Sequence, residues 1–269
     1  AAVAVSAAPG AALLERIARA VIANAGAGRE TTAVGPFVAL VDTVSAIPWS
    51  SLAVPAPGAP AGTDWAAPLP ALEAHFAARG RALRFEFLED LFPTLGPVLE
   101  RSGWPLGSRD PLFACRPGDL TPPKAVPGSS LEVLDADSPD ALVGLFLAVQ
   151  NRSFEPGTTR EPAAAERRQL ASRMRLGAIR CLLALLDGVP AGAGCALPAA
   201  GAAEIAGIGT LPQFRARGIG SAVTARLAAD LFATGTDLAW LTAGSEAAGR
   251  IYRRIGFRGL GAFQRNHGR

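Results

Sequence analysis

Apolar and polar positions along the second half of the chain predict helices and strands in turn. Apolar residues at spacings of three and four predict helices, and short dense apolar runs predict buried strands. The resulting order is strand, helix, helix, strand, strand, strand, helix, strand, helix, strand, at 131–135, 139–150, 163–176, 179–186, 191–197, 203–211, 218–232, 238–242, 245–255 and from 257. We therefore predict an α/β fold whose strands are antiparallel early and joined by helical crossovers late.

The pair Asp187-Gly188 lies between two of these apolar runs and favours a two-residue β-hairpin turn. In a regular hairpin of this length Cys181 lies opposite Gly194, so that Cys181 and Cys195 face opposite sides of the sheet. We expect no disulfide between them.

A segment rich in proline and glycine divides the chain. It predicts three parts: a domain at 1–116, a linker at 117–130 and a second domain at 131–269.

The end of the first domain resembles the end of the second. Residues 99–104 match 252–257 after a shift of 153 residues, and the same shift places Phe85 on Leu238. The shift predicts an internal structural repeat. The alternative is that any two helix-Gly-aromatic-strand units look alike in an α/β protein.

Composition excludes several kinds of chemistry. The chain of 269 residues has two histidines, His75 and His267, and neither is placed to assist a nucleophile, so a hydrolytic triad is not expected. The three cysteines show no metal-ligand spacing, which argues against a metal site. Their small, odd number fits a reducing, cytoplasmic compartment.

Charge and hydropathy argue against a membrane or nucleic acid as a partner. The apolar N-terminus has no basic segment before it, so we expect no signal peptide. Four prolines interrupt the longest uncharged run, 43–63, which argues against a membrane-spanning helix. The formal net charge is +3 and the basic residues are dispersed, so nucleic acid is not an expected partner.

The clearest chemical signal is the stretch 209–222, GTLPQFRARGIGSA, in which a strand ends at Pro212 and Arg215-x-x-Gly218-x-Gly220 opens a helix. Glycines at a helix start allow a ligand to approach closely. The free N–H groups of the first turn, aided by the helix dipole, form a site for an anion such as pyrophosphate. The alternative is a flexible turn with solvated arginines.

Over about 131–263 the chain resembles the GNAT superfamily of acyl-CoA-dependent N-acyltransferases. The resemblance is carried by Arg215-x-x-Gly218-x-Gly220 after a strand, a long helix, the short strand LAWLT and Tyr252-x-x-x-Gly256-Phe257, in the family's order and spacing. It implies a mixed, splayed sheet flanked by helices, with residues 1–116 as a degenerate GNAT-like half.

The resemblance also implies how acetyl-CoA, or a related acyl-CoA, is held as co-substrate without a metal. Backbone amides of 216–221 would bind the pyrophosphate, the strand edge at 208–210 would pair with the pantetheine arm, and Ser245 stands where many members have asparagine. The implied CoA-binding residues are Ile208, Thr210, Arg215, Ala216, Arg217, Gly218, Ile219, Gly220, Ser221 and Ser245.

Two residues stand at catalytic positions of the family. Tyr252, the single tyrosine, is at the general-acid position, where a phenol can protonate the leaving CoA sulfur. Its alternative role is packing alone. Glu204 is where GNAT enzymes often carry a catalytic glutamate, which could deprotonate an ammonium through a water. Its alternative is a solvated strand end.

We therefore predict an acetyl-CoA-dependent N-acetyltransferase that acts by direct attack of a primary amine of a small molecule or peptide. A catalytically silent acyl-CoA-binding sensor or scaffold and a purely structural interaction protein remain as alternatives. Under the 153-residue shift the phosphate loop falls on 62–67, GTDWAA, which lacks a second glycine and an arginine. The first half is therefore not expected to bind CoA. The acceptor, the acyl chain length and the oligomeric state stay open.

Overall fold

The fold is that of a computed structural model describing residues 10–25, 28–44, 50–60 and 62–268. Residues 1–9, on which the signal-peptide prediction partly rests, lie outside this part. The helices are α1 (Ala11–Ala25), α2 (Leu69–Ala77), α3 (Leu95–Arg101), α4 (Asp140–Phe154), α5 (Ala164–Arg175), α6 (Ile219–Ala233) and α7 (Glu246–Arg254), with 3₁₀ turns η2 (Pro117–Asp119) and η3 (Pro212–Phe214). The strands are β1 (Glu30–Val34), β2 (Phe37–Val41), β3 (Leu52–Pro55), β4 (Arg84–Leu88), β5 (Leu106–Cys115), β6 (Ser129–Leu134), β7 (Arg180–Leu186), β8 (Val189–Ala199), β9 (Ala202–Thr210), β10 (Leu238–Thr242) and β11 (Arg258–Gly268).

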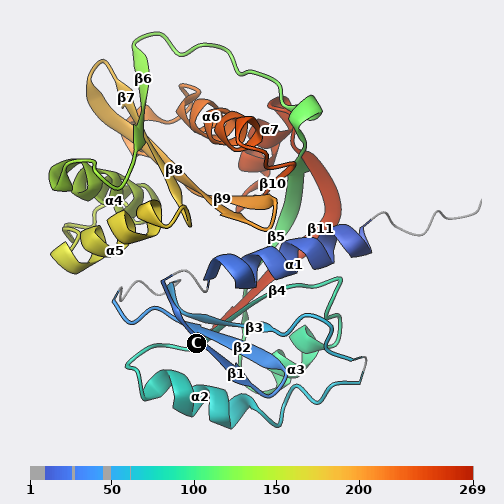
Figure 1. The fold of residues 1–269 in the computed structure, drawn as a ribbon. Coiled ribbons are helices and arrows are strands. Elements are labelled where there is room, and N and C mark those ends of the chain that lie inside the picture. Colours follow the sequence, from blue (N-terminus) through green and yellow to red (C-terminus); the bar gives the residue numbers. More distant parts are fainter. Residues whose placement is uncertain (1–9, 26–27, 45–49, 61, 269) are drawn as a thin grey trace, which may run out of the picture.

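In the described part of the chain, one 11-stranded mixed sheet has the order β1-β2-β3-β4-β11-β5-β10-β9-β8-β7-β6. The last strand of each half lies within the other half's sheet: β5 is between β10 and β11, and β11 is between β4 and β5 (Figure 1). β5 pairs with β10 and β11 of the second half, and β11 pairs with β4 and β5 of the first half. The two halves are therefore joined through one sheet.

The internal repeat is confirmed over the whole first half. Adding 153 to the bounds of its elements places each on an element of the same type in the second half: α1 on α5, β1 on β7, β2 on β8, β3 on β9, α2 on α6, β4 on β10, α3 on α7 and β5 on β11. The match extends to the order of the elements, which a chance likeness of one helix-strand unit would not produce.

The apolar faces of the elements meet on both sides of the sheet. One core packs α6 and α7 on the second half of the sheet, where the four predicted apolar positions of α6 are all buried: Ile219, Val223, Leu227 and Leu231. Burying each such side chain stabilises the fold by roughly 1.5–3 kcal/mol. The first half has its own core under α2 and α3.

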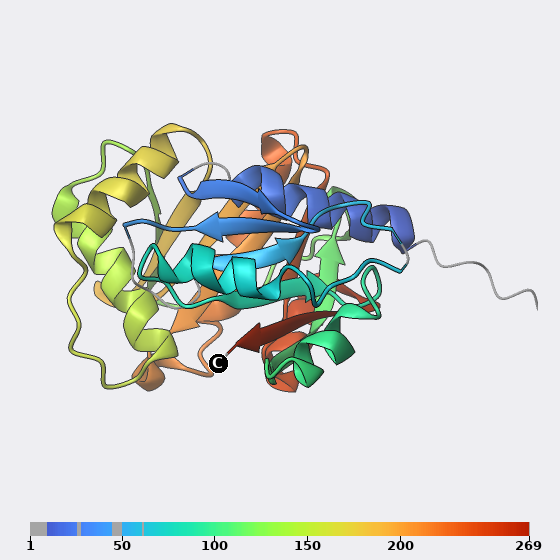
Figure 2. The ribbon, with the colours of Figure 1, turned by 90° about the horizontal axis from the view of Figure 1, so that it is seen from below.

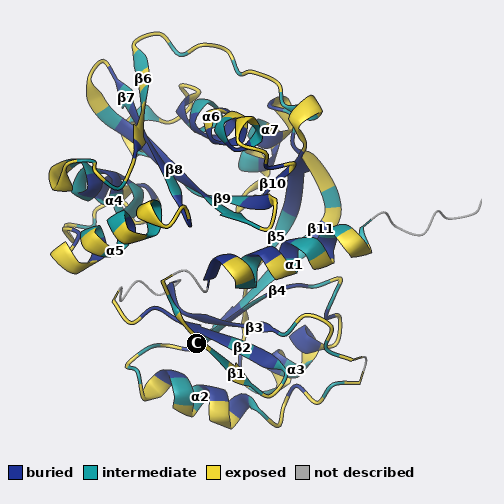
Figure 3. Cartoon of the chain, viewed as in Figure 1, coloured by how far each residue is buried: buried dark blue, intermediate teal, exposed yellow. Residues whose placement is uncertain are grey.

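Helix α1 packs on the opposite face of the sheet from α6. Leu14 and Ile17 of α1 contact a buried cluster that includes Leu238 and Trp240 of β10. In Figure 1, α1 crosses between the strands of the two halves, and Figure 2 shows α4 and α5 side by side at one end of the molecule. Buried residues line the facing surfaces of these elements, and exposed residues cover the outer faces of α2, α4 and α5 (Figure 3).

The predicted register of the β7–β8 hairpin is wrong. The turn at Asp187-Gly188 forms as expected. The pairing then shifts by one residue between Ala184 and Leu185, so that Cys181 lies opposite Cys195 rather than Gly194. A bulge places two residues of one strand against one of the other and moves every later side chain to the opposite face. All three cysteines are buried free thiols.

None of the helices in the described ranges is long and apolar enough to cross a membrane. Among the same residues, no group of three or more His, Cys, Asp or Glu side chains could hold a metal ion.

Candidate active site

The sheet opens between β9 and β10. These parallel strands pair from Ala202–Leu238 to Glu204–Trp240, and the pairing ends there. Beyond this point β9 continues along β8 to Thr210, while β10 continues along β5 to Thr242. The edge of β9 after Glu204 is thus free of a neighbouring strand on the β10 side. A free strand edge can bind an extended ligand through its main-chain groups.

A bulge bends β9 beyond the opening. Its register against β8 shifts between Ala193 and Cys195, and Gly207 has a φ of +61°. The Gly207 carbonyl accepts a hydrogen bond of 3.0 Å from Nε2 of Gln150 on α4. A Cβ at this position would lie 2.3 Å from that nitrogen. The left-handed conformation therefore favours glycine here, and a side chain would also displace the Gln150 amide.

The loop between β9 and α6 follows the bulge. After η3, Ala216 adopts a φ of +63° and Gly218 a φ of +88°, and Gly218 is the N-cap of α6. A non-glycine residue in this left-handed region carries strain, which the surrounding structure must hold.

Six consecutive backbone amides in this loop, those of residues 216–221, donate to no acceptor in the described part of the chain. The first hydrogen bond of the helix is made by Ala222, whose amide donates to the Gly218 carbonyl at 3.0 Å. A Cβ at Gly220 would lie 3.8 Å from Ile208 and Thr210, an ordinary contact distance, so this position is not crowded. Unpaired amides at a helix N-terminus form a site for an anion.

The predicted side chains around the loop have structural partners. Arg215 donates to the Thr210 carbonyl at 3.2 Å and to the Ser153 carbonyl of α4 at 3.1 Å, which ties the loop to β9 and α4. Arg217 lies 5.9 Å from the centre of the Phe214 ring. Ser245 caps α7, where its hydroxyl oxygen accepts from the Ala248 amide at 3.2 Å. This leaves the Ser245 O–H free to donate.

Tyr252 lies on α7 between Phe113 and Phe257, with ring centres 6.3 and 6.2 Å away. The side chain is 8% exposed, and its hydroxyl has no partner among the described residues. Burial raises the pKa of Tyr252, so the phenol keeps its proton at neutral pH. The residue thus packs as a core aromatic and also holds a free donor.

Glu204 faces the other side of the sheet. Its neighbours Ala203 and Ile205 belong to the core under α6, so the alternation of the strand directs Glu204 toward α1. There it lines a cavity of about 220 Å³ together with Trp240, Glu86 and Arg29, under residues of α1. The alternative of a solvated strand end is wrong, because β8 and β9 are continuous on either side of a tight turn.

The cavity perturbs the carboxyl groups that line it. Burial raises the pKa of Glu204 to about 8, helped by the nearby Glu86 carboxylate and opposed by the Arg29 guanidinium. Burial likewise raises the pKa of Glu86, with Arg29 again opposing. A carboxyl group with a pKa near the working pH is suited to take up and release a proton.

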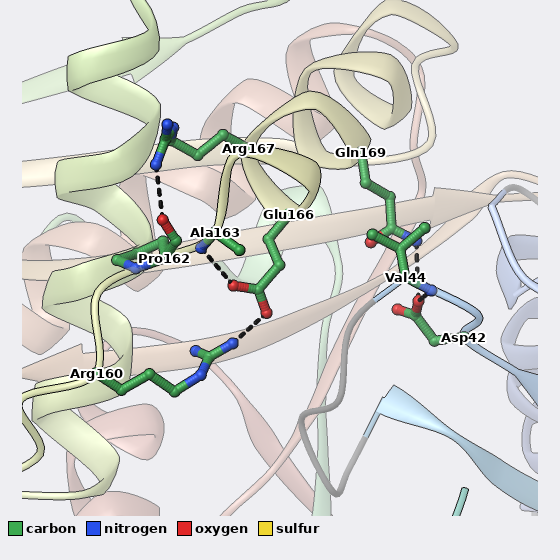
Figure 4. Close-up of polar contacts among 8 residues, drawn as sticks. All are labelled: Asp42, Val44, Arg160, Pro162, Ala163, Glu166, Arg167 and Gln169. Atoms are coloured by element: carbon green, nitrogen blue, oxygen red, sulfur yellow. Dashed lines mark hydrogen bonds and ion pairs between the residues drawn. The ribbon is translucent and has the colours of Figure 1, made fainter. Parts of the chain in front are cut away.

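A second cavity of about 240 Å³ adjoins the first, and Arg29, Leu197 and Ala206 line both. Its acidic side chains already have partners (Figure 4). Glu166 pairs with Arg160 and accepts from the Ala163 amide at 2.9 Å. Asp42 accepts from Gln169 at 3.0 Å.

Sequence and fold comparisons agree with this geometry. Residues 146–257 match the Acetyltransferase (GNAT) family. The chain is 30% identical to a GCN5-related N-acetyltransferase from Kribbella flavida over 95% of both chains, with a TM-score of 0.74. The chain belongs to the GNAT acetyltransferase family.

Two more GNAT structures share the fold across both halves. One is a tandem GNAT protein from the clavulanic acid biosynthesis pathway, with 14% identity, 97% of this chain and 96% of that chain covered, and a TM-score of 0.55. The other is a putative acetyltransferase of the GNAT family from Novosphingobium aromaticivorans, with 21% identity, coverage of 89% and 91%, and a TM-score of 0.54. No curated protein sequence matches the chain.

In the diverged first GNAT half, a side chain of the chain itself binds amides at the equivalent loop. The 153-residue shift takes Ile219 and Gly220 onto Ala66 and Ala67. The amides of these two alanines donate to the Asp64 carboxylate at 3.0 and 3.2 Å. A carboxylate of the chain itself thus takes the place that an anionic ligand would need.

The roles of the individual residues stay predictions. In the structure these residues form two groups. The loop residues and Tyr252 lie on the α6 face of the sheet, and Glu204 lies on the α1 face where the strands part. Sequence reasoning missed Glu86 and Arg29, which line the cavity from the first half. The alternation in β4, Phe85-Glu86-Phe87, was the available signal, and by itself it indicates a solvent-facing glutamate.

Proposed function

We propose that the chain transfers an acetyl or related acyl group from acyl-CoA to a primary amine by direct attack. The main observation behind this proposal is the row of six unpaired amides at residues 216–221. They lie beside the edge of β9 that is free after Glu204. We assign the CoA site and catalytic groups to 131–269, the degenerate GNAT-like half to 1–116 and the connection to 117–130. The buried free thiols fit the reducing compartment expected from the cysteine count.

The residues present fit acyl-CoA. The unpaired amides of 216–221 can donate hydrogen bonds to a pyrophosphate, and Gly220 has no side chain to keep it from the backbone. The free edge of β9 at Ile208 and Thr210 suits the amide groups of a pantetheine arm. Ser245 offers its O–H near the start of α7.

One proton-transfer group lies on each face of the sheet. Acetyl-CoA supplies a thioester whose carbonyl carbon the amine attacks, so that a C–N bond replaces the C–S bond. Glu204 takes one proton from the incoming ammonium, directly or through a water. Tyr252 donates its proton to the departing sulfur and regains one from the nitrogen. The products are an amide and the free thiol of CoA.

A screen of primary amines with acetyl-CoA, read as free thiol release, tests this function. Release that depends on the amine and yields the N-acetyl product supports it. An intact CoA site with no turnover on any amine would instead identify a silent acyl-CoA sensor.

Tyr252→Phe should lower kcat by about 10²-fold while leaving CoA affinity intact, because the phenol acts on the leaving sulfur and not on the bound nucleotide. The substitution removes only a hydroxyl without a partner in the described residues, so the packing against Phe113 and Phe257 should persist. Steady-state rates and calorimetric CoA binding measure the two effects. An unchanged kcat would remove Tyr252 from the chemistry.

Calorimetry should give one CoA per chain. The second half has free amides at its loop, whereas Asp64 occupies the corresponding amides of the first half. Two CoA molecules per chain would contradict this assignment, and Gly220→Asp would then show which of the two sites is the loop at 216–221.

A further inference from the structure

Arg29 lies where the two cavities meet and lines both of them. Its guanidinium makes no hydrogen bond or ion pair with any described residue. Burial and the charge of Arg173 lower the pKa of Arg29, while the charges of Asp42, Glu86 and Glu204 raise it. A guanidinium has five N–H donors and cannot lose its charge in a protein, so an enclosed one without a partner favours an anionic ligand.

Other donors around the cavities also lack acceptors. Trp240 is 1% exposed and lines the first cavity, and its Nε1 has no partner. In the second cavity the same holds for Nε of Arg173 and Nδ2 of Asn151. Buried donors are normally paired, so three unpaired ones around one space indicate that a ligand rich in acceptors belongs there.

None of the nearby acids forms an ion pair with Arg29 among the described residues, although the charges of Asp42, Glu86 and Glu204 act on it. Asp42 and Glu166, which line the second cavity, are held by other groups. Glu86 and Glu204 lie at the first cavity, beyond ion-pair distance from Arg29 in the described structure. Glu204 and Arg29 both line the first cavity without pairing, so a ligand there meets a carboxyl group and a guanidinium.

We propose that the acceptor is a small molecule with both a primary amine and a carboxylate, an amino acid in the broad sense. Its amine is placed at Glu204 and its carboxylate is bound by Arg29, with Arg173 as the second cation. This inference rests on the proposed function and names the substrate class for the same site. The planar fork of arginine matches the two oxygens of a carboxylate. Cavities of about 220 and 240 Å³ suit a molecule of this size.

The first test compares acceptors in matched pairs. α-Amino acids, β-alanine and 4-aminobutyrate are each assayed with acetyl-CoA against the corresponding carboxamide. The carboxylate member of at least one pair should have a kcat/KM about 10²-fold higher, mainly through KM, because the amide lacks the charge that Arg29 binds. Equal rates for acids and amides, or a preference for amides, would overturn the proposal.

The second test changes the cation. Arg29→Gln should reduce the preference for acid over amide to near unity, and Arg29→Lys should restore part of it. Arg173→Gln serves as a second variant if Arg29→Gln fails to fold. Arg168→Gln is the matched control, because Arg168 is an exposed arginine of α5 that lines neither cavity. A loss that is the same for acid and amide would mean that Arg29 only supports the fold.

A binding measurement separates this proposal from the proposed function. Thermal shifts of the CoA-bound protein are recorded with each acid and each amide, in the wild type and in Arg29→Gln. Stabilisation by an acid that requires Arg29 supports the carboxylate site even if no amine is turned over, in which case only the proposed function fails. Turnover of amines without any carboxylate preference leaves the function standing and refutes the site.

Discussion

Gly220→Asp should abolish acyl-CoA binding while the protein stays folded. The new carboxylate would stand in the row of amides at 216–221 and meet the negative charge of the pyrophosphate at close range. Opposing a like charge in this way costs several kcal/mol, which is a loss of about 10³-fold in affinity.

The fold should accept this substitution. Gly220 has a helical backbone, and a Cβ there would lie 3.8 Å from Ile208 and Thr210, an ordinary contact distance. A negative charge in the first turn of α6 interacts favourably with the helix dipole. We therefore expect an unchanged or slightly raised melting temperature, measured without CoA.

Two further variants separate charge from volume. Gly220→Asn has the same shape without the charge and should lose less affinity than Gly220→Asp. Gly118→Asp adds the same charge at an exposed position with open space around it and should bind CoA as the wild type does. Calorimetric titration with CoA measures all three, and wild-type affinity in Gly220→Asp would refute the loop as the pyrophosphate site.

The parts of the structure that sequence predicts are those set by local patterns. The glycines of the loop, the apolar spacing of α6 and the helix stop at Gly256 depend on residues close in sequence, and each lies where the pattern places it. The 153-residue repeat adds to these predictions, because one short match in the sequence predicts the order of the elements in the first half.

What sequence does not predict depends on contacts between distant residues. The exchange of β5 and β11 joins strands from opposite halves, and neither strand differs in pattern from one that would stay in its own half. The bulge in β8 falls at Ala191, between Pro190 and Gly192, and moves Cys181 opposite Cys195. A proline and a glycine mark an irregular strand position without giving the new register. Glu86 belongs to a strand of alternating pattern, and only the packing of the two halves turns its solvent-facing side into a cavity wall.

Asp64 is a physical reason to expect an anion site in the second GNAT half and not in the first. Both halves start a helix after the third strand of the repeat, and in both the first amides need an acceptor. The first half supplies a carboxylate of its own through Asp64, and the second half leaves the corresponding amides free. We therefore propose that the second half binds CoA, while the first half contributes Arg29 and Glu86 to the cavity wall.

Glu204→Gln should lower kcat/KM by about 10²- to 10³-fold and remove one limb of its pH profile. In the wild type, Glu204 with a pKa of about 8 must lose its proton before it can accept one from the ammonium. We expect kcat/KM to rise with pH up to about 8 and then level off. The profile of Glu204→Gln keeps only the ionisation of the amine itself, so the difference between the two profiles isolates the glutamate.

Neighbouring charges should move this limb in predictable directions. Glu86→Gln removes a carboxylate that raises the pKa of Glu204, so the limb should move to lower pH. Arg29→Gln removes a cation that lowers this pKa, so the limb should move to higher pH. Opposite shifts in the two variants would show that the first half tunes the base in the second. A limb that stays in place in both would mean that another group titrates.

The pH dependence of stability gives an independent check of the raised pKa of Glu204. The pKa of Glu204 is raised from 4.5 to about 8 by folding, so its neutral form is favoured in the native state. The associated stability is full below pH 4.5 and is lost as pH rises through 8, because the buried carboxyl must then ionise. Glu204→Gln carries no such cost. The difference in melting temperature between Glu204→Gln and the wild type should be constant below pH 4.5 and should grow by several degrees between pH 4.5 and 8. A difference that is constant at every pH would mean that Glu204 ionises with an ordinary pKa.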